Sequence, residues 1–77
     1  MSAETDTPQS EIPALTAREI ECIRFAAQGL TTGETAQCIS VTERTVEFHL
    51  GNATRKLGAS NKLRAVVIAL QLRLIEL

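Results

Sequence analysis

The stretch from Thr32 to Leu57 holds two helical patterns joined by a tight turn, and it constrains the fold more than any other part of the chain. Successive residues of an α-helix are about 100° apart, and at that spacing one narrow sector of the second pattern is entirely apolar. Its residues are Val46, Leu50, Ala53 and Leu57. Such a stripe faces a core, so the stretch predicts a helix packed on one side against the rest of a small domain.

The opposite side of the same segment carries an aromatic ring where polar side chains are usual. Phe48 lies there with Arg44 and Arg55, and Asn52 is beside them. An ordinary solvated face accounts for the charged residues alone, but it does not account for the phenylalanine. The pattern therefore indicates that the helix has a second contact surface, opposite the face that packs on the core.

Length and apolar composition favour a single all-α domain. A chain of 77 residues has room for one core and buries only about 60% of its unfolded surface. Phe25 and Phe48 are its only phenylalanines, and tyrosine and tryptophan are absent. Alanine, leucine, isoleucine and valine supply most of the apolar side chains, which suits thin helices in close contact better than packed sheets.

Charge is unevenly distributed along the chain. The formal net charge is −1, from 8 Lys and Arg against 9 Asp and Glu, and three acids, Glu4, Asp6 and Glu11, precede the first basic residue. Residues 1–13, which are also rich in Ser, Thr and Pro, are expected to be a disordered tail or the remnant of an interdomain linker. Residues 14–77 are the predicted domain, with eight bases against six acids (9 − 3) and a net charge of +2 (8 − 6). This balance neither excludes nor favours DNA as a partner.

Several functional classes lack the residues that they need. Cys22 and Cys38 form no CxxC pair and His49 is the only histidine, so the sequence predicts no metal site, no cofactor and no enzyme. Both cysteines are predicted to be small buried apolar residues. No run of about 18 apolar residues exists and no signal peptide is indicated, so we expect no membrane partner and a cytoplasmic location.

Four helices are predicted from residues that start and stop helices. The pattern places them at residues 17–28, 32–39, 43–57 and 62–74. Thr16 and Thr31 each precede a glutamate by three residues, which is the spacing of a capping box. Thr42 is the predicted cap of the third helix, and either Ser60 or Asn61 caps the fourth.

The last predicted helix has two apolar sectors. The first contains Leu63, Val66, Val67, Leu70, Leu74 and Leu77, and the second contains Ala65, Ile68, Ala69, Leu72 and Ile75. A terminal helix presses one face onto the core of so small a domain, so the other face needs a partner. We expect a symmetric dimer through this helix, with Ala65, Ile68, Leu72 and Ile75 as the candidate contact, although the pattern alone does not choose between the two faces. The alternative is a helix that lies deep in a groove and buries both faces within one monomer.

Short motifs follow one another in a fixed order from Ala14 to Ile75. They are Leu15-Thr16, Arg18-Glu19, Gly29-Leu30-Thr31, Glu34 and Ala36, then ISVTERTVEFHLGNATRKLGASNK and Ala65-Val66. In this order and spacing they resemble the LuxR-type, or GerE-like, helix-turn-helix domain of bacterial transcription regulators. The run TVEFHLGNATRKL followed by SNK is most similar to the C-terminal DNA-binding domain of acyl-homoserine-lactone quorum-sensing receptors.

The resemblance implies a four-helix, sequence-specific DNA-binding domain whose recognition helix, residues 43–57, enters the major groove. The residues expected to contact DNA are Arg44, Thr45, Glu47, Phe48, Gly51, Asn52, Arg55 and Lys56. Arginines can reach phosphates or guanine edges, Phe48 can press on a thymine methyl, and Glu47 can accept from cytosine N4. Asn52 is expected at a base edge or a phosphate, and Thr45 and Lys56 at phosphates.

The partners implied are double-stranded DNA with a palindromic operator, a second copy of the chain, and RNA polymerase. A signal ligand is expected only through a domain absent from this chain. A second hypothesis, motivated by Glu47 and the charge balance, is a short sensor-less protein that heterodimerises with a full-length LuxR-type regulator and inhibits it. Where the family has a glycine before its closing Leu-Ile, this sequence has Arg73, a departure that bears on dimer geometry.

Overall fold

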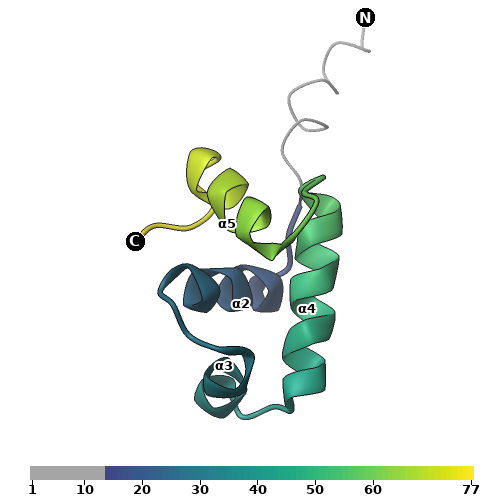
Figure 1. The fold of residues 1–77 in the computed structure, drawn as a ribbon, viewed down its shortest axis with the longest axis vertical. Helices are drawn as coiled ribbons and strands as arrows, with labels where there is room; N and C mark the ends of the chain where they lie inside the picture. The colour runs from purple at the N-terminus through teal and green to yellow at the C-terminus, as the bar shows by residue number, and fades with distance from the viewer. Residues whose placement is uncertain (1–13) are drawn as a thin grey trace, which may run out of the picture.

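The computed structural model describes residues 14–77, and within this range the chain folds into four α-helices with no β-strand (Figure 1). The helices are α2 (Ala17–Ala27), α3 (Thr32–Ile39), α4 (Glu43–Lys56) and α5 (Lys62–Gln71). The predicted all-α class is therefore confirmed. The prediction for residues 1–13 lies outside the described residues. None of the four helices has the length and apolar content that crossing a membrane requires.

Helices α2 and α4 form the centre of the domain. Each contacts the other three helices, whereas α3 and α5 lie on opposite sides of α2 and do not contact each other (Figure 1). The core contains Cys22, Ile23, Ala36, Ile39, Val46, Leu50, Ala53, Leu57, Ala65, Ala69 and Ile75. All four residues of the predicted inner stripe of α4 belong to this core, which confirms that face of the helix.

Capping boxes begin α2 and α3, as predicted. The Thr16 hydroxyl accepts a hydrogen bond from the Glu19 N–H at 3.1 Å, and the Glu19 carboxylate accepts one from the Thr16 N–H at 2.9 Å. Thr31 and Glu34 make the same pair of bonds before α3. Each box satisfies backbone donors that a helix start leaves free, so the boundary is set by residues only three positions apart.

Single side-chain caps begin α4 and α5. The Thr42 hydroxyl accepts from the Thr45 N–H at 3.1 Å, as the sequence predicted. Of the two predicted caps for α5, Asn61 and not Ser60 performs the role, because its side-chain oxygen accepts from the Arg64 N–H at 2.8 Å. The four helix starts therefore follow local hydrogen bonding.

Helix α5 ends earlier than predicted, whereas the other three helices end within one residue of their predicted ends. It stops at Gln71 because Arg73 adopts the left-handed conformation, with φ 61°. The Leu74 N–H then donates to the Ala69 carbonyl at 2.9 Å, which closes the helix as in a Schellman motif. This reversal returns Ile75 to the core, where it is only 4% exposed. The apolar pattern continues past the true end of α5 partly because the reversed chain buries Ile75.

The inner face of α5 is made of its small residues. Ala65 and Ala69 are fully buried, and their short side chains let the α5 backbone approach its neighbours closely. Ala65 and Ile75, two of the residues expected at a dimer contact, therefore lie inside the domain, and the structure corrects this part of the prediction. Leu63 and Val67 from the other sector remain on the surface, 73% and 44% exposed.

The two cysteines differ in exposure. Cys22 is fully buried, as predicted, and this burial raises the pKa of its thiol. Cys38 is exposed, so the prediction for this residue is wrong. Helix α3 turns Ala36 and Ile39 toward the core, and Cys38 lies about 200° around the helix from Ala36.

Candidate nucleic-acid interface

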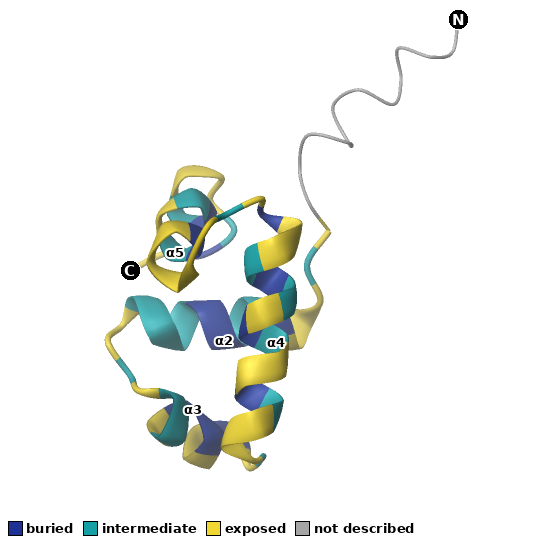
Figure 2. Ribbon diagram, turned by 45° about the vertical axis from the view of Figure 1, so that its right-hand side comes forward, coloured by how far each residue is buried: buried dark blue, intermediate teal, exposed yellow. Residues whose placement is uncertain are grey.

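Helix α4 is held by its inner face and leaves its outer face to solvent. Val46 and Ala53 are fully buried, and buried and exposed bands alternate along α4 in Figure 2. Of the residues predicted to contact DNA, six are exposed and two, Thr45 and Asn52, are half-buried. The fold thus brings all eight onto one helix outside the core. It leaves the outer face of α4 available to a large partner.

Phe48 is the main apolar feature of this outer face. Its side chain is 63% exposed, and its ring meets the His49 ring edge-on, with centroids 5.6 Å apart. Burial of the exposed part of a phenylalanine ring is favourable in proportion to the apolar area removed from water. A partner that covers α4 therefore gains binding energy from Phe48, which the isolated domain does not use for folding.

A shallow groove of about 550 Å³ lies between the start of α3, the middle of α4 and the start of α5. It is lined by Thr32, Glu47, Leu50, Gly51, Thr54, Arg55, Ala59 and Lys62. The groove joins Glu47, Gly51 and Arg55 to Thr32 and Lys62, which are not among the site residues predicted from the sequence. Lys62 was visible as the first residue of a predicted helix, but only the fold reveals that this helix starts beside α4.

Gly51 leaves the α4 backbone open along this groove. A Cβ atom built at Gly51 meets nothing within 4 Å, so no neighbouring side chain requires a glycine there. Glycine in an exposed helix interior costs about 1 kcal/mol relative to alanine. Close approach of a partner to the helix backbone is a physical reason for such a residue at this position.

Lys56 has a partner inside the domain. Its ammonium lies 2.9 Å from one carboxylate oxygen of Glu19 and 3.2 Å from the other. Burial of Glu19 by itself would raise its pKa, but the hydrogen bond and charge of Lys56 and the Thr16 N–H outweigh it, so the pKa is lowered. From the sequence, Lys56 is expected at a phosphate and Glu19 only in a capping box. Their 37-residue separation gave no signal of the ion pair.

Arg55 is also engaged, but on the outer face. Its Nη2 donates to the Asn52 side-chain oxygen at 2.7 Å, and both residues remain accessible. Arg44 makes no side-chain hydrogen bond or ion pair with the residues that the structure describes. The outer face therefore offers one free guanidinium, one held guanidinium and an aromatic ring.

Comparison with known sequences links this arrangement to one family. Residues 13–69 match the family described as bacterial regulatory proteins, luxR family. The chain is 52% identical over 63 residues to the HTH-type quorum sensing-dependent transcriptional regulator RpaR of Rhodopseudomonas palustris, a match covering 82% of this chain and 26% of RpaR. It is 48% identical over 56 residues to the transcriptional activator protein VanR of Vibrio anguillarum, covering 73% of this chain and 23% of VanR. The chain spans about a quarter of the length of these relatives.

Comparison with solved structures gives the same fold. The structure of the transcription factor GerE superposes with a TM-score of 0.77 and 29% sequence identity. The superposition covers 80% of this chain and 92% of the GerE chain. The four helices described above are thus an arrangement already seen in a transcription factor.

Proposed function

This chain belongs to the LuxR family of bacterial regulatory proteins and carries its helix-turn-helix DNA-binding domain. We propose that the domain reads a two-fold operator as a homodimer, with α4 as the recognition helix in the major groove. One observation above all supports this. The helix is anchored by an apolar inner stripe and turns Phe48, Arg44 and Arg55 outward. The major groove of B-DNA is wide enough to admit one such helix.

Each outward side chain has a base or phosphate that suits its chemistry. Arg44 can donate two hydrogen bonds to guanine O6 and N7, and Phe48 can cover a thymine methyl. The Glu47 carboxylate repels phosphate but can accept a hydrogen bond from cytosine N4. It therefore lowers affinity for DNA in general and favours duplexes with a cytosine at that position. Thr45 takes a phosphate contact near the start of α4. We propose that these contacts give the domain high sequence selectivity but only modest affinity for DNA.

Weak dependence on salt should accompany this selectivity. Residues 14–77 carry a net charge of +2, and Lys56 is already paired with Glu19. The slope of affinity against salt follows the number of phosphates neutralised, which is small for so few free cations. Lys62 and Arg55, which both line the groove, are the cations best placed to meet the DNA backbone.

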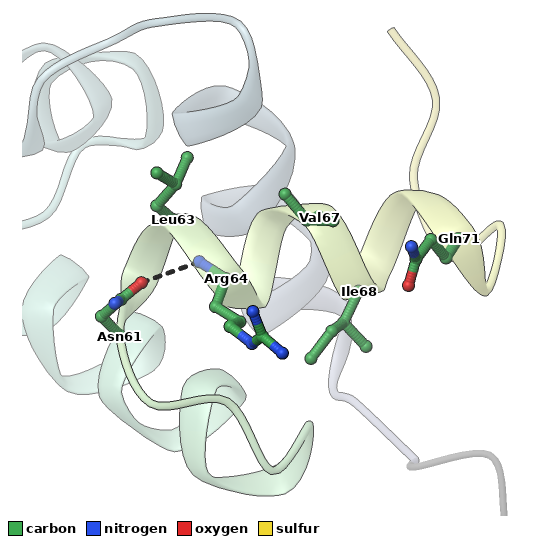
Figure 3. A pocket seen from close by; sticks show the side chains of 6 residues that line it. All are labelled: Asn61, Leu63, Arg64, Val67, Ile68 and Gln71. Atoms are coloured by element: carbon green, nitrogen blue, oxygen red, sulfur yellow. Dashed lines mark hydrogen bonds between the residues drawn. The ribbon is translucent and has the colours of Figure 1, made fainter.

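The exposed face of α5 is the proposed contact between two copies. Leu63 and Val67 project from one side of α5 (Figure 3), and together with Ile68 and Gln71 they line a pocket of about 330 Å³. Of the residues first expected at the dimer contact, Ile68 is half-buried and Leu72 is exposed, so both remain able to take part. A symmetric pair formed here would set the distance between two recognition helices.

The proposed setting is quorum-sensing-dependent transcription, because relatives such as RpaR are named for that kind of regulation. We propose the cytoplasm as its location and RNA polymerase as a further partner. The same α5 face would also serve the second function, heterodimerisation with a longer regulator. Glu47 on the outer face of α4 favours that alternative, because an acid there weakens DNA binding.

A selection from a duplex pool with a randomised core tests the proposal. We expect the 77-residue chain to enrich a two-fold sequence, and Arg44→Ala to lose discrimination between that duplex and a scrambled one in fluorescence-anisotropy titrations. Gln37→Ala, which removes an exposed uncharged side chain from α3, is the matched control. Discrimination that survives Arg44→Ala would sink the recognition-helix assignment. Failure to enrich any sequence, with capture of a longer LuxR-type regulator instead, would favour the inhibitor function.

A further inference from the structure

We propose that Asn52 is a positioning residue that holds the Arg55 guanidinium ready for DNA and does not itself read a base. This inference rests on the DNA-binding function proposed above. It differs from the sequence-based expectation that Asn52 meets a base edge or a phosphate. The carrying observation is the 2.7 Å hydrogen bond from Arg55 Nη2 to Asn52 Oδ1 on the outer face of α4.

The bond orients both side chains along the helix. Residues three apart on an α-helix are surface neighbours, so Arg55 reaches back toward the N-terminal half of α4 to find Asn52. That half carries Phe48 and Arg44. The guanidinium has five N–H donors and uses one here, so most of its donors stay available to a phosphate or a guanine.

The same bond engages the oxygen that Asn52 would use to read an adenine directly. The bidentate contact of an asparagine with adenine requires the side-chain oxygen to accept from N6 while the amide donates to N7. Here Oδ1 points at Arg55 and accepts from a charged donor, which is among the stronger kinds of hydrogen bond. Because Oδ1 has two lone pairs, a bidentate base contact by Asn52 would have to share this oxygen between adenine N6 and the Arg55 guanidinium, which would weaken its hold on the arginine.

Holding the arginine in advance favours binding. A free arginine samples many rotamers, and ordering it in a complex costs conformational entropy. A guanidinium that is already held on the exposed face of the free protein loses less conformational entropy when DNA binds. Asn52 is half-buried whereas Arg55 is exposed, so Asn52 is the better placed of the two to serve as the anchor.

A double-mutant cycle on the enriched duplex tests the proposal. Dissociation constants are measured for the 77-residue chain and for Asn52→Ala, Arg55→Ala, the double variant and Asn52→Asp. Each protein is titrated with the enriched duplex and with every single base-pair change in it. Gln37→Ala serves as the control for removing an exposed amide, and circular dichroism verifies that every variant is folded.

We expect Asn52→Ala to weaken binding about threefold to tenfold, the scale of one hydrogen bond, and the double variant to match Arg55→Ala. Base preferences changed by Asn52→Ala should be among those changed by Arg55→Ala. Asn52→Asp keeps an oxygen for Arg55, so its pattern of base preference should stay that of the unaltered chain while its overall affinity falls through phosphate repulsion.

Three results would overturn the positioning role. Additive effects in the double variant would mean that Asn52 contacts DNA independently of Arg55. An adenine preference lost in Asn52→Ala but kept in Arg55→Ala would make Asn52 a direct reader. No effect of Asn52→Ala would leave it without a role. Failure of the unaltered chain to enrich any sequence is a different result, because it would overturn the DNA-binding function together with this inference.

Discussion

The Lys56 ammonium lies 2.9 Å from Oε1 of Glu19, which joins the last turn of α4 to the first turn of α2. Glu19 is only 3% exposed, and its carboxylate also accepts from the Thr16 N–H. One buried carboxylate therefore caps α2 and anchors the end of the helix proposed to enter DNA. No side-chain nitrogen or oxygen that is buried among residues 14–77 lacks a hydrogen-bond partner, so the pair leaves Glu19 fully satisfied.

Removing the cation of this pair should destabilise the domain. Lys56→Met is expected to lower the free energy of unfolding by about 2 kcal/mol, because it leaves a buried carboxylate without its charge partner. Glu19→Gln, which keeps an oxygen for the cap and frees a lysine that can reach solvent, should cost about 1 kcal/mol. Urea denaturation at pH 7 measures both. The control is Glu21→Gln in the exposed Arg18–Glu21 pair, also 2.9 Å long, which should change stability by less than about 0.5 kcal/mol. Equal losses of unfolding free energy at the two pairs would contradict a stabilising role for the buried Lys56–Glu19 pair.

Stability should depend on pH through Glu19. Its pKa in the folded state is lowered from the ordinary value of 4.5, so the ionised carboxylate contributes stability that is fully present above about pH 4.5. This contribution disappears as the pH falls through the lower folded-state pKa. The difference in unfolding free energy between the unaltered chain and Glu19→Gln should therefore be constant from pH 7 to about pH 5 and shrink in stronger acid. A difference that grows with acid would refute the direction of the shift.

Replacement of Arg73 by glycine should stabilise the domain. Arg73 has φ 61°, a conformation that costs a residue with a Cβ atom about 1 kcal/mol and glycine almost nothing. We expect Arg73→Gly to raise the free energy of unfolding by about 0.5 to 1 kcal/mol, as thermal denaturation can measure. Arg73→Ala removes the same side chain but keeps the Cβ atom, so it should give no such gain. Equal effects of the two variants would locate the cost in the side chain instead.

Gly51→Ala should separate stability from binding. No atom lies within 4 Å of the added Cβ, and alanine is favoured over glycine in a helix, so the variant should be more stable by about 0.5 to 1 kcal/mol. Its affinity for the enriched duplex should fall, because the methyl group stands in the groove where the backbone is otherwise open. Denaturation and anisotropy titrations on one preparation measure the two quantities. Unchanged affinity would place the DNA away from this part of α4.

A charge on the exposed face of α5 should weaken pairing between copies. Val67→Glu is expected to reduce cooperative binding of a second chain to a duplex with two half-sites, while leaving the fold intact because Val67 is on the surface. Leu77→Glu adds the same charge at another exposed apolar residue, outside the proposed contact, and should keep cooperativity. Sedimentation of the complexes gives the number of chains per duplex. The proposed face is wrong if both variants behave alike.

Much of the fold could be predicted because its signals are local. The caps at Thr16, Thr31 and Thr42 act on backbone groups three residues away, so they can be recognised from a short segment of sequence. The inner stripe of α4 repeats with the helical period and marks Val46 and Leu50 as core without knowledge of their neighbours. The candidate site follows from the same periodicity, because the residues of α4 that lie opposite the apolar stripe form its outer face.

Only the tertiary structure decided which groups meet across the chain. Sequence alone determined that α5 has two apolar sectors, but not that Ala65 and Ala69 would form the inner one, because that depends on how closely helices approach. The partner of Lys56 lies 37 residues away, beyond any periodic signal. Arg73 takes a glycine-like conformation because the burial of Ile75 outweighs its backbone cost. Local hydrogen bonds and periodicity therefore determined the helices, whereas packing between distant segments decided which faces remain for partners.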